Sequence, residues 1–447
     1  MSGGVVTNTA YLIIGNSAGG IGAAEAIREV DTMRPITIVS GEPYPAYSRP
    51  LISKYLAKER DLEDMRFRPA DFYERNDIAP LLGKRVTRLL LNDRAVELGD
   101  GHRVVWEKLL IATGGVPIVP GIESINKRGV FPFITLDDAR AIDEFVEGGQ
   151  KAVVIGGGLI GISATEALVK RGVEVSIVEM KDRVLNTILD EEGSSIAGDA
   201  LEKAGVELLC GQTVLQILGN EAVTGVVLSS TDLLPCNMVV VAIGVVPHVD
   251  LAGGTGIEVN RGIVVDRHMA TSHEDVYACG DVAEAYDFVY HSNRLTPIWP
   301  NAYIGGRTAG YNMAGVETQY PGGTAMNSLT YFGLDITTAG IVAPPDGDGY
   351  QCLSRNEDGA YRKLVLKDDA LVGMICIGEI EKSGILYSLM RDETNVESFK
   401  ESLLADDFGL ASLPREMWQE RLGKPHSGAV FPREACHERV EEYVGGE

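Results

Sequence analysis

Two glycine-rich stretches of the chain have the residue types and the spacing that bind a dinucleotide. In the stretch KAVVIGGGLIGISATEALVKRGVEVSIVE, residues 151–179, the glycines Gly156, Gly158 and Gly161 follow the spacing G-x-G-x-x-G. The first permits a tight turn, the second lets backbone approach a pyrophosphate, and the third lets a helix pack close to a strand. Glu179 lies about twenty residues further on, where a carboxylate can accept hydrogen bonds from both ribose hydroxyls. We therefore predict a dinucleotide site in this stretch.

The run GNSAGG, residues 15–20, repeats this chemistry with one departure. Gly15 and Gly20 take the outer glycine positions, whereas Ser17 stands where the middle glycine is expected. A serine makes the approach of a phosphate slightly harder but adds a hydroxyl donor. Glu42 lies just beyond the following β-branched run, although a Ser-Gly pair precedes it. We expect a second dinucleotide site here.

The elements that must position these residues follow the same order in both halves. A buried strand leads into each glycine turn, and a helical pattern and a second strand follow, at residues 11–39 and 152–179. Both halves then continue through short strands to an apolar strand with a small-residue turn, at 86–114 and 206–244. Two copies of one nucleotide-binding plan in one chain are a more specific signal than either fingerprint. The pattern predicts an α/β protein with two Rossmann-like domains and a crossover near Pro117 and Pro120.

Further strands and helices are expected beyond residue 244. An apolar strand from Val276 to Cys279 ends at Gly280-Asp281, and we expect a helix directly after it. Asp281 could accept a ligand hydroxyl or could equally cap that helix. The other expected elements are a helix at 303–313, strands at 328–332, 336–342, 362–367 and 371–377, and helices at 383–391 and 396–404.

Composition limits the class of protein. A chain of 447 residues with 45% hydrophobic residues is expected to form two or three globular domains. Its formal net charge of −24 disfavours nucleic acid and anionic membranes as partners. No apolar run is long enough to span a membrane, so we expect a cytoplasmic protein. The six cysteines form no C-x-x-C pair, which argues against a disulfide framework and against zinc or iron–sulfur ligation by this chain.

Several short motifs resemble one family. The double fingerprint, ATGG at residues 112–115, AIG followed by Pro247, and ACGDVAE at 278–284 are similar to the FAD-dependent pyridine-nucleotide oxidoreductases, over roughly residues 10 to 410. The resemblance implies that the first copy binds FAD, that the second binds NAD(H), and that an α+β interface domain follows, as in the glutathione-reductase-like fold. It implies five segments: FAD-binding 1–116, NAD-binding 117–244, FAD-binding again 245–320, interface 321–410, and a tail 411–447.

The stretch YSRPLISK, residues 47–54, narrows the resemblance. It lacks the cysteine of the disulfide reductases, and its R-P-x-x-S-K order resembles ferredoxin and rubredoxin reductases and the flavin-binding part of nitrite reductases. That resemblance implies Arg49 near the FAD phosphates and Lys54 near flavin N5 as the catalytic residue, although each could be an exposed surface charge. The cofactor-binding residues it implies are Gly15, Ser17, Gly20, Glu42, Arg49, Lys54, Val86, Ala112, Thr113, Gly114, Gly156, Gly158, Ile160, Gly161, Glu179, Gly244, Gly280, Asp281 and Trp299.

One position departs from the family pattern. The glutamate that usually pairs with the lysine beside the flavin lies two residues past the third glycine, where this chain has Ser163, and Glu166 lies one helical turn further on. We therefore expect Lys54 to lack its partner, which would favour an anionic, electron-rich flavin or an altered potential.

The two cofactors together imply a reaction. Hydride would pass from NADH to flavin N5, and single electrons would leave for an iron–sulfur protein or a subunit of a larger oxidoreductase. The alternatives are an NADH oxidase that reduces oxygen or quinone and, more remotely, a cofactor-sensing module. Trp299 would border the flavin or pack in the core. The tail from Leu413 could dock a partner or be a disordered terminus, and a homodimer or a hetero-oligomeric complex is compatible with the sequence.

Overall fold

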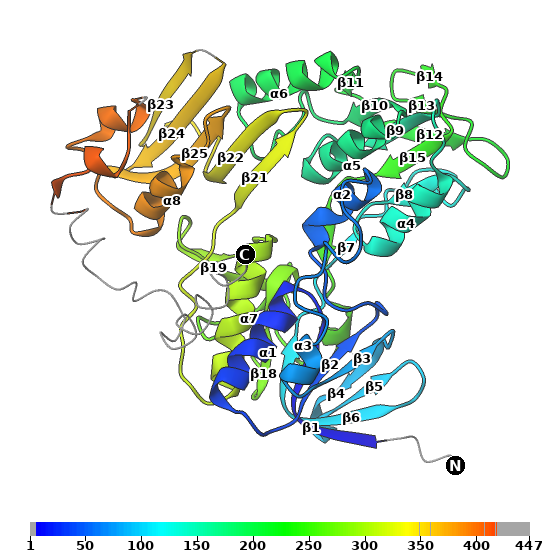
Figure 1. Ribbon diagram of the computed structural model, residues 1–447, viewed down its shortest axis with the longest axis vertical. Coiled ribbons are helices and arrows are strands. Elements are labelled where there is room, and N and C mark those ends of the chain that lie inside the picture. Colours follow the sequence, from blue (N-terminus) through cyan, green and yellow to red (C-terminus); the bar gives the residue numbers. More distant parts are fainter. Residues whose placement is uncertain (1–5, 348, 358, 406, 416, 418–447) are drawn as a thin grey trace, which may run out of the picture.

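The computed structural model describes residues 6–347, 349–357, 359–405, 407–415 and 417. Its elements form three groups, which Figure 1 shows as a lower unit built around β1 and α1, an upper unit around β9 and α5, and a lateral unit around β21–β25. The lower and the upper unit confirm the expected α/β class with two Rossmann-like halves, and the lateral unit is the additional C-terminal unit. The five segment boundaries stay a prediction.

The lower unit is a sheet of order β3-β2-β1-β6-β5-β4, to which β18 adds by pairing in parallel with β6. β1, β2, β3 and β6 run parallel, so their carboxyl ends meet at one edge. The strands are β1 (Val6–Ile14), β2 (Ile36–Ser40), β3 (Ile78–Leu82), β4 (Val86–Leu90), β5 (Ala95–Leu98), β6 (Arg103–Ile111) and β18 (Val276–Ala278), and the helices are α1 (Ala18–Val30), α3 (Phe72–Arg75) and α7 (Trp299–Met313).

Helices α1 and α7 pack together through glycines. A Cβ atom on Gly306 would lie 2.0 Å from the carbonyl oxygen of Gly19, and one on Gly310 would lie 2.4 Å from that of Ala23. Only residues without a side chain allow this approach. The late helix α7 is thereby fixed against the helix that follows the first glycine turn.

The upper unit repeats the plan with a parallel sheet of order β11-β10-β9-β15-β8. Its inner strands β9, β10 and β15 have buried residues on both faces, as a parallel sheet covered by helices requires, whereas the outer strands β8 and β11 are partly exposed. The elements are β8 (Val130–Pro132), β9 (Lys151–Ile155), β10 (Glu174–Glu179), β11 (Glu207–Cys210), β15 (Met238–Val241), α4 (Leu136–Phe145), α5 (Leu159–Lys170) and α6 (Glu191–Lys203), with a separate sheet of β12 (Val214–Leu218), β13 (Gly225–Leu228) and β14 (Leu233–Leu234).

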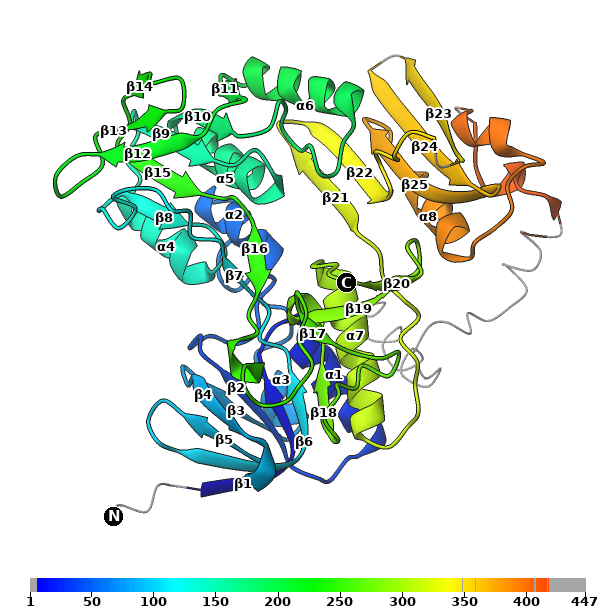
Figure 2. The ribbon, with the colours of Figure 1, turned by 180° about the vertical axis from the view of Figure 1, so that it is seen from behind.

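Two connections tie the lower unit to the upper one. The strands β7 (Gly115–Pro117) and β16 (Val245–Pro247) pair antiparallel where the chain crosses in each direction, as Figure 2 shows. The short helix α2 (Ile52–Leu56) also reaches the upper unit, where Ile52 and Leu56 are buried in the same core as Ile162 of α5. A segment of the first half therefore packs against the second nucleotide-binding unit.

The C-terminal unit is an antiparallel sheet of order β21-β22-β25-β24-β23 with α8 packed on it. Its elements are β21 (Met326–Tyr331), β22 (Leu334–Gly340), β23 (Tyr350–Glu357), β24 (Ala360–Lys367), β25 (Ala370–Ile377) and α8 (Ser383–Arg391). Four of the five strands and α8 were expected. The exposed edge strand β23 was not, because its polar sequence YQCLSRNE lacks a buried pattern.

Two expectations about helices were wrong, and a third, the helix at 303–313, was right except for its first residues. Asp281 lies in a 3-10 turn, Gly280–Val282, and the strands β19 (Ala283–Asp287) and β20 (Ser292–Arg294) follow it. β19 also pairs with β17 (Ile263–Val264), and the next helix is α7. α7 begins four residues before Tyr303, with Trp299 in its first turn. Only 400–404 of the expected helix 396–404 is helical, as a 3-10 turn, because the Val396 N–H donates to the Asp369 carbonyl. In the part of the chain described, no helix is long and apolar enough to span a bilayer.

Candidate dinucleotide sites and their junction

The first glycine turn is closed against the neighbouring strand. Gly15 has φ +125°, and a Cβ atom there would lie 2.1 Å from the Ala112 carbonyl oxygen at the end of β6. A Cβ atom on Gly20 would lie 1.9 Å from the Gly15 carbonyl oxygen. Ser17 is the N-cap residue of α1 and its side chain makes no capping hydrogen bond, so this helix N-terminus keeps N–H groups for an anion.

Three segments meet at this turn. The Cβ position of Gly19 lies 2.8 Å from Cys279 Sγ and 3.3 Å from the Ala302 carbonyl oxygen, so the turn, the end of β18 and the start of α7 are in contact. Asp281 follows directly, and none of the described residues donates a hydrogen bond to its carboxylate. Burial raises the pKa of Asp281, while the charge of Arg49 acts to lower it. A largely buried acceptor without a donor fits a ligand hydroxyl better than the helix cap, since no α-helix starts there.

Arg49 forms an ion pair with Glu42 and is not a lone charge on the surface. Its Nη2 donates to Glu42 Oε1 at 2.6 Å, and the Tyr47 hydroxyl donates to Glu42 Oε2 at 2.7 Å. The Leu136 N–H of α4 donates to Tyr47 at 3.0 Å, so this cluster joins the two nucleotide-binding units. Arg49 is thus paired within the protein, and its expected place near the FAD phosphates stays a prediction. The expected ribose contact of Glu42 stays a prediction, with both oxygens already engaged by protein donors.

The second glycine turn has the same construction. Gly156 has φ +108° and its Cβ position lies 2.5 Å from the Ala242 carbonyl oxygen, and the Cβ position of Gly161 lies 1.9 Å from the Gly156 carbonyl oxygen. A Cβ atom on Gly158 would meet nothing within 4 Å, so the start of α5 faces open space. Glu179 is 9% exposed and accepts from the N–H groups of Gly157 at 2.7 Å and Lys181 at 2.8 Å. These donors orient the carboxylate and leave lone pairs for ribose hydroxyls.

The other expected site residues lie at or beside these turns. The Thr113 hydroxyl donates to the His248 carbonyl at 2.9 Å, which ties the turn after β6 to the return crossing. Val86 is buried in the core of the lower unit at the start of β4. Trp299 is partly buried and meets Phe67 edge-on, with ring centroids 5.0 Å apart. The remaining ones are in the turns and first helical turns: Ala112, Gly114, Ile160, Gly244 and Gly280.

Lys54 does not lack a partner, contrary to the expectation. It lies on α2, with Nζ 3.4 Å from Glu166 Oε2 on α5 and 3.2 Å from Glu59 Oε2. Lys170 Nζ adds contacts with both carboxylates. The expectation of an uncompensated lysine was wrong because α2 packs on the turn of α5 that carries Glu166. Glu59 and Lys170 were missed, although the i, i+4 spacing of Glu166 and Lys170 is a sequence signal for a helical ion pair.

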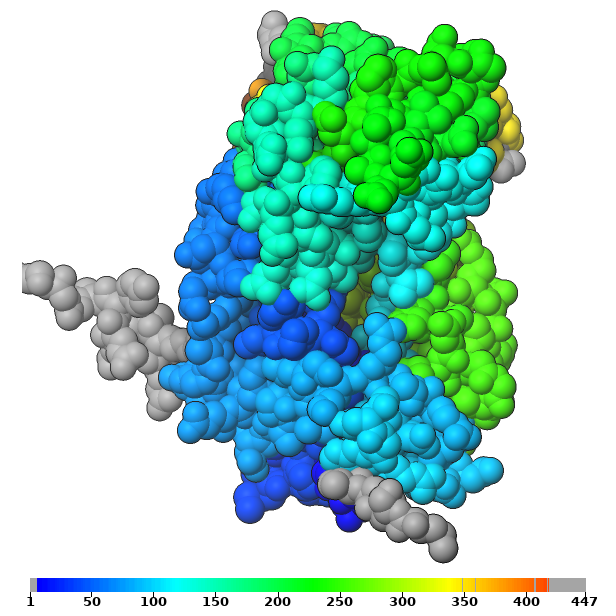
Figure 3. Space-filling view, turned by 90° about the vertical axis from the view of Figure 1, so that its right-hand side faces the viewer, coloured from blue at the N-terminus to red at the C-terminus, as the bar shows by residue number. Residues whose placement is uncertain are grey.

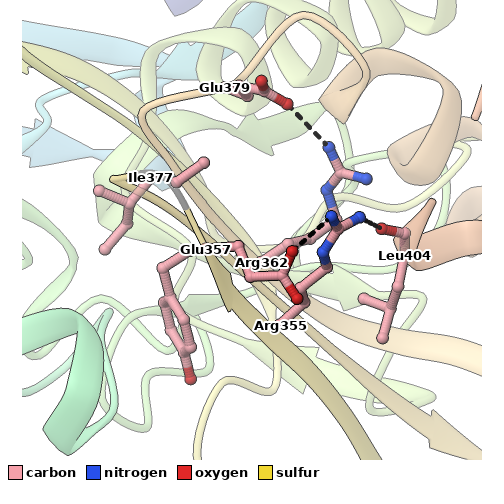
Figure 4. A pocket seen from close by; sticks show the side chains of 8 residues that line it. Arg355, Glu357, Arg362, Ile377, Glu379 and Leu404 are labelled. Carbon is pink, nitrogen blue, oxygen red and sulfur yellow. Dashed lines mark hydrogen bonds and ion pairs between the residues drawn. The ribbon is translucent and has the colours of Figure 1, made fainter. Parts of the chain in front are cut away.

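Two pockets that involve the C-terminal unit lie away from the glycine turns. One, of about 100 Å³, is lined by Arg355, Glu357, Ala360, Tyr361, Arg362, Ile377, Glu379 and Leu404. Figure 4 shows its charges paired: Arg355 contacts Glu357 at 2.7 Å and the Leu404 carbonyl, and Arg362 lies 3.7 Å from Glu379. It holds only a few waters, far too little room for a dinucleotide. A pocket of about 550 Å³ lies between the loop after β22 and the start of α6.

The residues present fit two dinucleotides. Each turn offers a helix N-terminus without a side-chain cap, a glycine contact with the next strand, and a carboxylate near the end of the second strand. Figure 3 shows a hollow on one face between the lower unit, in blue, and the upper unit, in cyan and green. The segment that carries Arg49 and Lys54 crosses between the units: Lys54 meets Glu166 of α5, and Tyr47 accepts from Leu136 of α4.

Comparisons with known proteins agree with this geometry. Residues 9–306 match the family model described as pyridine nucleotide-disulphide oxidoreductase, and residues 326–394 match the rubredoxin NAD+ reductase C-terminal domain. The epsilon subunit of NADH-dependent phenylglyoxylate dehydrogenase from Aromatoleum evansii is 31% identical, over 90% of this chain and 96% of its own. NADH-rubredoxin oxidoreductase from Clostridium acetobutylicum is 28% identical, over 83% and 92%.

A solved structure extends the likeness to the whole arrangement. The ferredoxin reductase for the CYP199A2 system of Rhodopseudomonas palustris has a TM-score of 0.83 and 25% identity, covering 90% of this chain and 99% of its own. The chain spans about half the length, 48% and 49%, of two other curated relatives, a nitrite reductase and an assimilatory nitrate reductase electron transfer subunit of Bacillus subtilis.

Proposed function

The chain belongs to the pyridine nucleotide-disulphide oxidoreductase family, and from this premise we propose that it carries electrons from NADH to an iron–sulfur protein or subunit. It is a flavoprotein oxidoreductase that uses FAD and NAD(H). The proposal adds the acceptor and the roles of the residues. The observation that carries it is the pair of matched glycine turns at Gly15–Gly20 and Gly156–Gly161, each closed against the next strand's carbonyl.

The chain's own residues divide the work between the two turns. The turn at Gly15, with Asp281 as hydroxyl acceptor and Arg49 as cation, would hold FAD, and the turn at Gly156, with Glu179 on the ribose, would hold NADH. When bound, FAD supplies the exchange between two-electron and one-electron transfer that nicotinamide lacks. Lys54, oriented by carboxylates at the junction, would place a positive charge beside the reacting ring.

The acceptor is supported by the relatives. Their names include an NADH-rubredoxin oxidoreductase and a ferredoxin reductase, and the C-terminal unit matches the domain of a rubredoxin reductase. The state of Cys279 agrees with electron transfer that does not pass through a thiol. Burial, together with the charge of Asp281, raises the pKa of Cys279 to about 12, so this residue is not a reactive thiolate. The cysteines that the structure describes are free, in keeping with a proposed location in the cytoplasm.

The test begins with the purified protein. It should be yellow, release FAD on acid treatment, and bleach when NADH is added without oxygen. The reduced protein is then mixed in a stopped-flow instrument with rubredoxin, with a ferredoxin, with quinone and with oxygen. We expect an iron–sulfur protein to reoxidise it at catalytic rates. Oxygen or quinone accepting electrons at catalytic rates while no iron–sulfur protein does would establish an oxidase instead, and a protein that takes up no FAD would refute both.

A further inference from the structure

The junction between α2 and α5 contains a charge cluster that the family pattern does not predict. Residue 163 is Ser163, and the carboxylate that meets Lys54 comes from Glu166, three residues further along α5. Glu166 is 8% exposed, so its charge needs partners within the protein. The side chain of Lys54 is 33% exposed and lies on a helix from the other nucleotide-binding unit.

Glu166 has three polar partners. Its Oε2 lies 3.4 Å from Lys54 Nζ, its Oε1 lies 3.0 Å from Lys170 Nζ, and Oε1 also accepts from the Phe332 N–H at 3.1 Å. The Phe332 backbone belongs to the turn between β21 and β22, where Phe332 and Gly333 have φ +47° and +79°. Two positive φ values in a two-residue loop give a rigid hairpin turn. The carboxylate is therefore held by backbone through Oε1, while Oε2 meets Lys54.

Glu59 is the competing partner of Lys54. Its Oε2 lies 3.2 Å from Lys54 Nζ, and Oε1 contacts Lys170 at 2.5 Å, but its side chain is 38% exposed. Exposed pairs are screened by water and contribute little to orientation. Glu166 is buried and anchored by backbone, so it has the stronger hold on the lysine.

We propose that Glu166 is the positioning residue for Lys54. It supplies, from one helical turn further along α5, the carboxylate that the family pattern puts at position 163, and it links this lysine to the β21–β22 hairpin of the C-terminal unit. The inference rests on the proposed function only in placing Lys54 beside bound FAD. Two lysines and two carboxylates leave the cluster neutral, so the positive charge of Lys54 is compensated. Removing the buried carboxylate would free that charge and loosen the lysine.

The experiment compares four variants loaded with FAD. Glu166→Gln keeps an oxygen for the Phe332 N–H but removes the charge, and Glu174→Gln is the matched control, an exposed glutamate at the start of β10. Ser163→Glu combined with Glu166→Gln returns a carboxylate to the family position. Glu59→Gln tests the competitor. The measurements are the flavin midpoint potential by dye equilibration, the rate of anaerobic bleaching by NADH, and the thermal unfolding midpoint.

For Glu166→Gln we expect a higher flavin potential, because the uncompensated lysine stabilises the more negative reduced cofactor. Bleaching by NADH should slow about tenfold because the lysine is misplaced. Glu166→Gln should still fold and hold FAD, although removing a buried paired charge should lower its unfolding midpoint below that of the exposed control Glu174→Gln. The double variant should reverse most of the rise in potential and most of the fall in bleaching rate, and Glu59→Gln should change both quantities less than Glu166→Gln does.

Three results would overturn the proposal. Glu166→Gln could match Glu174→Gln in potential and rate, Glu59→Gln could have the larger effect, or Glu166→Gln could lose FAD or fail to fold without recovery in the double variant. The last result would assign Glu166 a structural role only. These comparisons need FAD and NADH but no iron–sulfur protein, so they stand even if the proposed acceptor is wrong.

Discussion

At the scale of single residues, the two sites depend on carboxylates whose environments differ. Glu179 accepts two backbone N–H groups and ends a parallel strand, whereas Asp281 is largely buried without a described donor. The two backbone donors fix the direction of the Glu179 carboxylate. A fixed negative charge beside the ribose is the physical basis for choosing NADH, because it repels a 2′-phosphate.

Glu179 provides the first residue-scale prediction. The protein should prefer NADH to NADPH by about tenfold to a hundredfold in kcat/KM, or roughly 1.4–2.8 kcal/mol, since Lys181 and Arg183 nearby soften the repulsion. Glu179→Gln should narrow this preference, because an amide does not repel phosphate. Steady-state kinetics with both nucleotides measure the ratio, and Glu174→Gln, at the far end of the same strand, is the control. Equal kcat/KM values for the unchanged protein would contradict the prediction.

Sequence reasoning at this scale identified the turns better than it identified the partners. The glycines could be found because their spacing is local and their φ values and close contacts demand glycine, as at Gly15 and Gly156. The partner of Lys54 could not, because residues 54 and 166 meet only through the packing of α2 on α5. The family pattern places the carboxylate partner of Lys54 at position 163, which is a serine here. It therefore predicted a lysine without a partner, whereas in the structure Glu166 takes that part.

At the scale of elements, the sequence predicted buried strands and helices with a clear hydrophobic period well. It did not predict a polar edge strand or a segment whose start is held by a tertiary hydrogen bond. The inner strands of the upper parallel sheet, β9, β10 and β15, are mostly apolar on both faces, which is the most recognisable pattern. β23 pairs only with β24 at the sheet edge and is mostly exposed, so its sequence carries no such pattern. The segment from Val396 has helical residues, but one backbone hydrogen bond to the β24–β25 turn replaces its first helical turn.

The contact between α6 and the C-terminal sheet gives the prediction for this scale. Asp190 caps α6 through the Gly193 N–H at 3.0 Å and accepts from Tyr361 at 2.6 Å and Lys363 at 2.8 Å. Asp190→Asn leaves the nearly buried Lys363 without its counter-charge and should cost about 2 kcal/mol. Thermal unfolding and hydrogen exchange in β24 would show it. The control is Asp182→Asn, which removes an exposed carboxylate paired with Arg183. It should change the free energy of unfolding by no more than about 0.5 kcal/mol.

The same contact should depend on pH. Burial acts to raise the pKa of Asp190, but the hydrogen bonds from Lys363 and Tyr361 outweigh it and hold the pKa below the ordinary value of 3.8. A lowered pKa in the folded state stabilises the protein above the unfolded value, and this stability is lost as the pH falls through the folded value. The destabilisation caused by Asp190→Asn should therefore be full near neutral pH and shrink below about pH 4. An effect of constant size down to pH 2 would contradict this account.

At the scale of the whole molecule, the lower unit and the C-terminal unit both contact the upper unit. The crossing strands β7 and β16, the α2 segment and the β21–β22 hairpin all converge on the upper unit, so each of the other two units contacts it at a different place. Sequence duplication predicted two of the units, and their contacts required the structure, because they pair residues far apart in the chain. An acceptor must approach this assembly from outside, and the charge of the whole chain then affects the encounter.

The formal net charge of −24 gives the prediction at this scale. If the acceptor is a free, acidic iron–sulfur protein, both partners repel each other at long range, and the second-order rate of its reduction should rise with salt. The Debye length falls from about 30 Å at 0.01 M to about 3 Å at 1 M ionic strength, so most of the rise should occur over that interval. Stopped-flow mixing of the NADH-reduced protein with the acceptor measures the rate, and an uncharged quinone, whose rate should not respond to salt, is the control.

A rate independent of salt and of acceptor concentration would indicate a permanently bound subunit. A rate that falls as salt rises would show that a local positive surface outweighs the net charge, contrary to the prediction.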